Sequence, residues 1–165
     1  MTQTSLLEAV QNGFWETAEH LMFHHTNPWE LDEALVAWGY DVGPCEAQDL
    51  LGLDAVLARN PARAVPILPR MVAEGRMGKI GGVGYYRYPG GGGAVIDPLI
   101  EDLILEEAWF ARVRRHEMQD SALVAAMNSS IRKVLDGYPL TEEVPKVLAQ
   151  AVHFPPDRIG ELTGP

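Results

Sequence analysis

Residues 43–54 read GPCEAQDLLGLD, a stretch that combines a helix start signal with apolar residues. Pro44 suits the first position of a helix, because the N–H that proline lacks would be unpaired there anyway. The apolar residues that follow recur at helical spacing: Leu50, Leu51, Leu53, Val56 and Leu57. Gly43 is expected to adopt a positive φ in the preceding turn, and Gly52 to lie inside the helix where another helix packs closely. The pattern predicts one helix over about residues 44–57.

Helical periodicity extends in both directions from this stretch. Residues 4–25 carry an apolar stripe at spacings of three and four: Leu7, Val10, Phe14, Ala18 and Leu21. Asn27 and Pro28 have the character of an N-cap and a first helical residue, and Gly39 of a C-cap. Further helices are expected over residues 65–74, 98–118, 121–135 and 141–153. Because no alternating pattern is longer than residues 84–88, the predicted fold is an all-α helical bundle.

Glycine divides the chain near its middle. Residues 75–88 read GRMGKIGGVGYYRY, and the adjoining residues 89–93 read PGGGG. Four consecutive glycines are costly to order, so an exposed linker between two helical halves is expected there. The predicted division is a first unit over residues 1–88, a linker over 89–96 and a second unit over 97–165.

Composition limits the partners and the location. Twenty-three acidic and thirteen basic residues give a net charge of −10, which disfavours nucleic acid. Residues 112–116 are the nearest approach to a basic patch, and they are expected to be a solvated helix face. No apolar run is long enough for a membrane span, and the first six residues do not resemble a signal peptide. The single cysteine, Cys45, suits a reducing compartment, so the cytoplasm is the expected location.

Three groups of residues have chemical potential but are interpreted as structural. Glu16, His20 and His24 are spaced by four, as metal ligands on one helix face would be, yet that face lies opposite the apolar stripe and no metal site is predicted. Cys45 at a helix start would have a lowered pKa through the helix dipole, but a buried packing role is favoured. Glu107 is expected to pair with Arg114 rather than to act as an acid or base.

Three motifs in the same order resemble the C-terminal helical domain of the 3-hydroxyacyl-CoA dehydrogenases. They are DEAL at residues 32–35, GPCEAQDLLGLD at 43–54 and the glycine-rich stretch at 75–88, which is similar to the closing loop of that family. The likeness covers residues 16–88. Residues 126–137 and 153–156 look like a weaker second copy of the same unit, so the resemblance implies a duplicated helical fold.

The resemblance also implies where the chemistry lies. In this family NAD binds a separate Rossmann domain that carries the catalytic pair, so no catalytic residue and no cofactor are expected in this chain, and NAD only on a partner protein. The active-site Asn of the family falls on Leu7 here, with Asn12 as the nearest substitute. Ile80 and Val83 stand where the family has lysines. Three residues therefore remain as candidates for binding substrate: Asn12, Arg76 and Lys79.

Two functions follow as alternatives. In the first, the chain is a stand-alone domain in fatty acid metabolism that contributes an acyl-CoA site wall and a dimer surface, and depends on a Rossmann partner for hydride transfer. In the second, it is an inactive binding or assembly module that kept only the fold. A homodimer is favoured, because the first two helices carry much aromatic area: Trp15, Phe23, Trp29 and Trp38. The alternative is that the second half covers those rings through Trp109 and Phe110.

Overall fold

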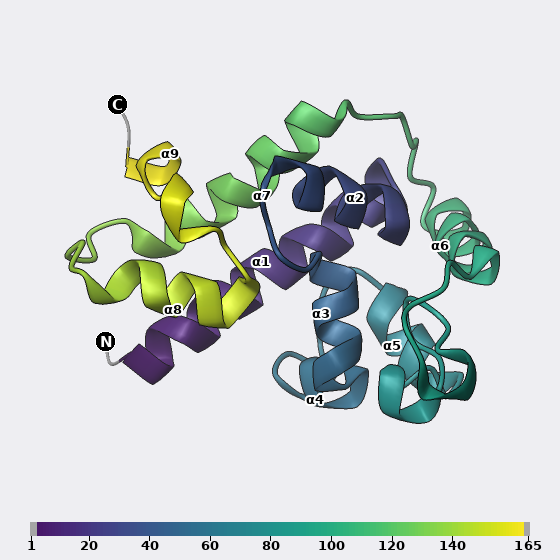
Figure 1. Cartoon of the computed structure of the whole chain (residues 1–165). Helices are drawn as coiled ribbons and strands as arrows, with labels where there is room; N and C mark the ends of the chain where they lie inside the picture. Colours follow the sequence, from purple (N-terminus) through teal and green to yellow (C-terminus); the bar gives the residue numbers. More distant parts are fainter. Residues whose placement is uncertain (1–2, 164–165) are drawn as a thin grey trace.

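The protein is described by a computed structural model, which covers residues 3–163 and is helical (Figure 1). The units predicted to begin at residue 1 and end at residue 165 reach just outside the described residues. Within residues 3–163 no β-strand forms, and extended pairing is limited to isolated bridges around the glycine-rich loop. The all-α prediction is confirmed.

The α-helices are α1 (Gln3–His24), α2 (Pro28–Trp38), α3 (Pro44–Leu51), α4 (Leu53–Ala58), α5 (Ile67–Ala73), α6 (Pro98–Phe110), α7 (Asp120–Leu135), α8 (Glu143–Val152) and α9 (Gly160–Thr163). Short 3-10 turns are η1 (Lys79–Gly81), η2 (Pro89–Gly91) and η3 (Pro156–Arg158).

Helix α1 runs through the middle of the molecule (Figure 1). It packs against α7 and α8 from the second half of the chain and against α3, α5 and α6 on other sides. Val10, Phe14 and the rest of the predicted stripe are buried, with Leu7 partly so. Trp15 and Phe23, which lie off that stripe, are buried as well. Because α1 is covered from several sides, it buries apolar residues on more than one of its faces.

The predicted helix ends are confirmed where a side chain or a glycine caps them. The Asn27 side chain accepts a hydrogen bond from the Glu30 N–H at 2.9 Å, and Asp97 accepts one from Leu99 at 3.2 Å. Gly39 follows α2 with φ of 141°, a conformation that a side chain would strain. These caps pair backbone groups that would otherwise lack a partner at the helix ends. The residues at these positions therefore decide where α2 and α6 begin and where α2 ends.

The helix expected over residues 44–57 is interrupted at Gly52, which corrects the prediction of an internal packing glycine. Gly52 has φ of 109° and separates α3 from α4. The break turns the Leu53 N–H toward the Met77 carbonyl, to which it donates at 2.9 Å. A tertiary contact with the glycine-rich loop therefore replaces a bond inside the helix.

The helix expected to reach Met118 ends at Phe110; residues 111–112 form a turn, and residues 113–119 have no regular secondary structure. Arg112 has φ of 58°, and Arg115 donates hydrogen bonds to the carbonyls of Met22 at 3.0 Å and Thr26 at 2.6 Å. Carbonyls at the end of a helix lack partners within it, so the guanidinium of Arg115 satisfies the end of α1. The prediction that residues 112–116 form a solvated helix face is wrong as to the helix, since they are not helical. Arg112, Arg114 and His116 are exposed as expected, whereas Arg115 is half-buried.

The two halves of the chain pack on each other through α1, α7 and α8. Between them Gly90 to Gly93 are exposed, and η2 is a single turn in which Gly90 has φ of 63°. The second half covers Trp38 through Phe154, whose ring centroid lies 5.8 Å away. The expectation that Trp109 and Phe110 do the covering is wrong, because both rings are exposed. No helix in residues 3–163 combines the length and apolarity needed to cross a membrane.

Candidate functional site

The first two sequence motifs meet at a buried carboxylate, Asp32 on α2. Its Oδ1 accepts from the Cys45 N–H at 2.9 Å, and its Oδ2 accepts from the Glu46 N–H at 3.0 Å. The Tyr86 hydroxyl donates to Oδ2 at 2.8 Å. Gly43, the N-cap of α3, has no side chain with which to cap the helix, so Asp32 supplies the missing acceptor from a neighbouring helix.

A second buried carboxylate, Asp49 on α3, holds the glycine-rich loop. It accepts from the N–H groups of Tyr85 and Tyr86 at 2.9 and 3.0 Å, and from the Tyr88 hydroxyl at 2.7 Å. All three tyrosines are buried. The loop is therefore a chain reversal that lays its tyrosines onto the helices.

Glycine is required where the backbone approaches these carboxylates. A Cβ on Gly43 would overlap the Asp32 side chain, and one on Gly84 would lie 2.7 Å from Asp49 Cγ and 2.8 Å from Gly78 Cα. Gly43 itself has φ of −72°, so the expected positive φ is wrong. The close approach of Asp32, and not backbone conformation, explains glycine at position 43.

Burial shifts the protonation of both carboxyl groups. Removal from water raises the pKa of Asp32 to about 7 and that of Asp49 to about 6, against the opposing effect of their hydrogen bonds. Asp32 can be accommodated in the protonated form, because the Tyr86 hydroxyl is also 3.3 Å from the Pro28 carbonyl. The hydroxyl can then donate to Pro28 and accept from the carboxyl group.

We expect the free energy of unfolding to increase as the pH falls from about 8 to about 5. The folded pKa values of Asp32 and Asp49 lie above those of the unfolded chain, so the folded state binds protons more tightly and is favoured at low pH. His24, whose pKa burial lowers, acts in the opposite direction but is half exposed. Urea unfolding across this range measures the slope, and Asp32→Asn should flatten it. A stability that falls steadily over the same range would show that the carboxylates are charged in the fold.

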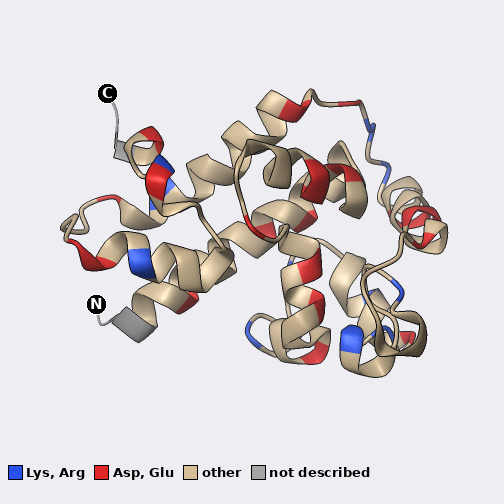
Figure 2. Cartoon of the chain, viewed as in Figure 1, with Lys and Arg blue, Asp and Glu red and all other residues tan. Residues whose placement is uncertain are grey.

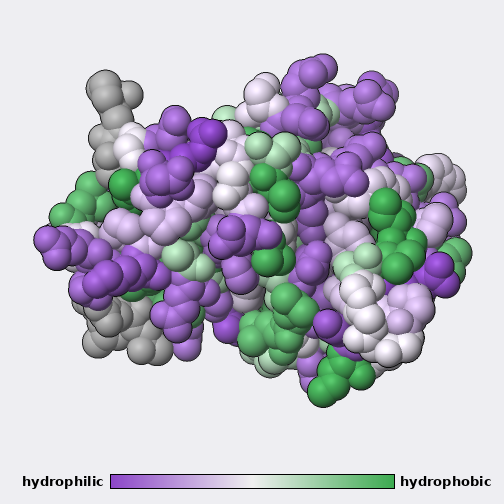
Figure 3. Space-filling model, in the orientation of Figure 1, coloured by the Kyte–Doolittle hydropathy of each residue, from purple (hydrophilic) through white to green (hydrophobic). Residues whose placement is uncertain are grey.

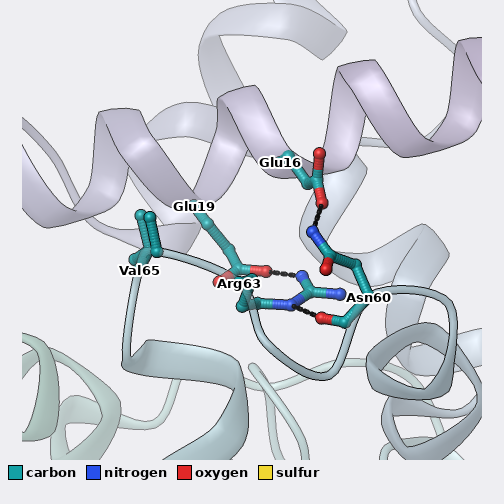
Figure 4. A pocket seen from close by; sticks show the side chains of 6 residues that line it. Glu16, Glu19, Asn60, Arg63 and Val65 are labelled. Carbon is teal, nitrogen blue, oxygen red and sulfur yellow. Dashed lines mark hydrogen bonds and ion pairs between the residues drawn. The ribbon is translucent and has the colours of Figure 1, made fainter.

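Sequence reasoning missed a cavity of about 260 Å³ beside α1, between Glu16, Glu19, Asn60 and Arg63 (Figure 4). Glu19 is only 1% exposed and forms an ion pair with Arg63. Burial raises the pKa of Glu19 to about 7, although Arg63 lowers it. Asn60 donates to Glu16 at 2.7 Å at the rim of the cavity. The signal was present in the sequence, since Glu19 lies four residues from both Trp15 and Phe23 and shares their buried face.

Comparison with known proteins accounts for the motifs around Asp32 and Asp49. The family model described as 3-hydroxyacyl-CoA dehydrogenase, C-terminal domain, matches residues 6–88. The chain belongs to this family. Both carboxylates, the three tyrosines and the required glycines lie within the matched residues.

Relatives of this 3-hydroxyacyl-CoA dehydrogenase C-terminal domain are longer proteins. A peroxisomal fatty acid beta-oxidation multifunctional protein of Oryza sativa is 33% identical over 47% of this chain and 12% of its own length. A peroxisomal bifunctional enzyme of Danio rerio is 27% identical over 90% of this chain and 25% of its own. The chain thus spans about a quarter or less of these two relatives.

A solved structure extends the likeness in fold beyond the family match. The dehydrogenase part of multifunctional enzyme 1 from C. elegans superposes with a TM-score of 0.70 at 17% identity, over 86% of this chain and 34% of that one. This coverage is wider than residues 6–88, so the helical arrangement of much of the second half is shared as well.

The three candidate substrate-binding residues of this dehydrogenase-type domain have different surroundings. Asn12 on α1 accepts a hydrogen bond from Arg59 at 3.3 Å. Arg76 pairs with Asp97 at 2.9 Å and donates to the Gly84 carbonyl at 2.9 Å. The Lys79 ammonium lies 5.9 Å from the centre of the Tyr88 ring. Arg76 thus ties the loop to the start of α6, whereas Lys79 has no ion-pair partner within the described residues.

The side chains interpreted as structural are the histidines of α1, Cys45 and Glu107. No cluster of three metal-binding side chains occurs in residues 3–163, and His20 is exposed. Cys45 is buried with its Sγ 3.6 Å from Met22 Sδ, and burial raises the pKa of its thiol instead of lowering it. Glu107 lies 3.4 Å from Arg70. The predicted pairing with Arg114 is wrong, because Arg114 lies beyond the end of α6 in a segment that is not helical. Figure 2 shows acidic residues on α2, α3 and α6, in keeping with the negative charge.

Proposed function

We propose that the chain contributes a helical domain to the oxidation of 3-hydroxyacyl thioesters, forming a wall of the acyl-CoA site. The NAD-binding domain, with the catalytic pair, would lie outside these 165 residues. Hydride would pass from the C3 carbinol carbon of the thioester to the nicotinamide, and the hydroxyl proton to a base on that other domain. This chain would hold the acyl-CoA and exclude water.

The observation that carries this proposal is the family match over residues 6–88. Within it, the buried polar residues have structural roles: Asp32 and Asp49 join three segments of chain through their hydrogen bonds and are not free to act on a substrate. A domain whose buried polar residues stabilise its own fold can still position a ligand. The residues that react with the ligand would then belong to the NAD-binding domain.

The protein mixed with NAD and a 3-hydroxyacyl-CoA is expected to produce no NADH by itself. Addition of a separately purified NAD-binding domain from a relative should produce NADH. Turnover without that domain would overturn the dependence on a partner. No turnover with it would leave binding as the remaining role, which calorimetry tests directly.

Lys79 is the best residue with which to test acyl-CoA binding. It is half-buried on the glycine-rich loop and free of ion pairs within the described residues, so Lys79→Ala should weaken acyl-CoA binding about tenfold and leave the fold intact. Lys146→Ala on α8 is the matched control, because Lys146 is an exposed lysine with only a weak contact to Glu143 at 3.5 Å. If the two variants bind acyl-CoA with equal affinity, Lys79 is not part of the acyl-CoA site.

A second candidate function is an assembly module without ligand. It is favoured by the internal partners of Asn12 and Arg76 and by Leu7 at the position where the family has Asn. Absence of measurable acyl-CoA binding by the wild-type protein would select it. For either function we propose a cytoplasmic location, on the ground of the free buried Cys45.

A further inference from the structure

Glu19 differs from the other buried carboxylates of the chain. Charged side chains are found mostly at the surface, and hydrophilic residues cover much of the face drawn in Figure 3. The carboxylates buried among the described residues are Glu19, Asp32, Asp49 and Asp97. Both oxygens of each aspartate accept hydrogen bonds. Glu19 Oε1 pairs with Arg63, but no group in residues 3–163 donates a hydrogen bond to Oε2, so this buried acceptor needs a further donor.

The Glu19 side chain lines the cavity beside α1 (Figure 4). Asn60 and Arg63, from the loop between α4 and α5, form the opposite side, and Ala64 and Val65 of the same loop form its apolar wall. The volume of about 260 Å³ is larger than the about 150 Å³ that accommodates a benzene-sized molecule. Asn60 at the rim is exposed, so a small ligand can enter from solvent.

The cavity offers acceptors for hydrogen bonds. Asn60 Nδ2 donates to Glu16 Oε1 at 2.7 Å, which leaves the Asn60 side-chain carbonyl and the second Glu16 oxygen available. Glu16 and Glu19 are three residues apart on α1 and are therefore neighbours on the helix surface. Arg63 donates to Glu19 and to the carbonyls of Asn60 and Val56. A primary ammonium group has three N–H donors and no acceptor, which matches three acceptors from three residues.

The charges around the cavity also favour a cation. The carboxylates of Glu16 and Glu19 outnumber the single guanidinium of Arg63. The neighbouring Arg59 donates to two other side chains of α1 and does not line the cavity. An anion would be repelled by two carboxylates, and a quaternary ammonium ion has no N–H to donate to Glu19 Oε2.

We propose that this cavity binds a primary ammonium ion with a short alkyl chain, held by Glu16, Glu19 and Asn60, with the alkyl chain against the apolar wall. The proposal goes beyond the role in acyl-CoA binding, because the ligand is a small cation. The residues involved are also different from Lys79, so ammonium binding and acyl-CoA binding can succeed or fail separately.

Calorimetry of the full chain with n-butylammonium chloride at pH 8 and moderate salt tests the site. We expect a Kd below about 1 mM, which is within reach of so small a ligand. Tetramethylammonium chloride is the matched control ligand, because it carries the same charge but no N–H, and it should not bind measurably. Absence of n-butylammonium binding would overturn the proposal. Equal binding of the two cations would also overturn it, since both would then respond only to the net charge of −10.

A pair of substitutions on α1 tests the position of the ion. Glu16→Gln should weaken n-butylammonium binding about tenfold, because it removes a charge from the cavity but keeps an acceptor for Asn60. Glu8→Gln is the matched control, since Glu8 is exposed two turns away on the same helix and its loss changes the net charge equally. Its Kd should equal that of the wild-type protein. Equal losses in the two variants would overturn the site.

The pH dependence of binding tests the role of Glu19. Burial raises the pKa of Glu19 to about 7 and Glu16 adds to the rise, against the opposing effects of Arg63 and of the Leu68 N–H, which makes no hydrogen bond to Oε2. An alkylammonium group, like that of lysine, stays charged up to about pH 10. Because Glu19 is mostly ionised at pH 8 and mostly protonated at pH 6, the Kd for n-butylammonium should rise about tenfold between them.

Glu19→Gln should abolish both the binding and its pH dependence, with circular dichroism to verify that the variant folds. The other titratable groups close to Glu19, Tyr85 and Cys45, are buried with raised pKa values and keep their protons from pH 6 to pH 8. A wild-type affinity that is the same at both pH values would show that the ion does not contact Glu19 and would overturn the proposal, even if Glu19→Gln failed to fold.

Discussion

Gly84→Ala is expected to destabilise the protein by about 3 kcal/mol, which is a large part of the stability of a domain of this size. The new Cβ would overlap Asp49 Oδ1 and lie 2.8 Å from Gly78 Cα. Asp49 could give way only by releasing the N–H groups of Tyr85 and Tyr86, which are buried. Overpacking and unsatisfied donors act together here. Urea unfolding followed by circular dichroism measures the loss.

Gly93→Ala is the matched control for this substitution. Gly93 is exposed, no atom lies within 4 Å of a Cβ built there, and its φ does not lie in the positive range that strains a side chain. Its stability should change by less than about 0.5 kcal/mol. Similar losses in the two variants would mean that glycine is needed for chain flexibility, and that the contact with Asp49 is not the cause.

Arg63→Met is expected to cost about 4 kcal/mol, because it leaves Glu19 buried without its ion-pair partner. It also removes hydrogen bonds from the guanidinium to the carbonyls of Asn60 at 3.0 Å and Val56 at 3.2 Å. The loss should be larger at pH 8 than at pH 6. Burial already raises the pKa of Glu19 to about 7, so the unpaired carboxyl escapes its charge by protonation at the lower pH.

The double variant Glu19→Met with Arg63→Met should recover much of this stability, since no unpaired charge then remains inside. Arg70→Met is the control, because Arg70 is partly exposed and pairs with Glu74 and Glu106 at the surface. It should cost less than about 1 kcal/mol. If the double variant is as unstable as Arg63→Met, the hydrogen bonds to Asn60 and Val56 hold the loop, and the ion pair does not.

Local sequence patterns are enough to predict the helices and where most of them begin and end. The prediction of the apolar stripe on α1 is correct, because apolar residues at spacings of three and four share one face of a helix. Asn27, Asp97 and Gly39 act on neighbouring backbone groups, so their effect is visible in a few residues of sequence. The family motifs were also recognisable, since they are contiguous runs of residues.

The roles of those motif residues depend on contacts between segments that are far apart in the sequence. Asp32 and Asp49 bind backbone groups 13 and 36 residues away, and no periodicity within one helix reveals an acceptor at that distance. The same holds for Gly52, where a bond to Met77 breaks a helix, and for Arg115, which leaves a predicted helix to bind the end of α1. Local propensities differ by about 1 kcal/mol, so a single buried hydrogen bond to a distant segment is enough to override them.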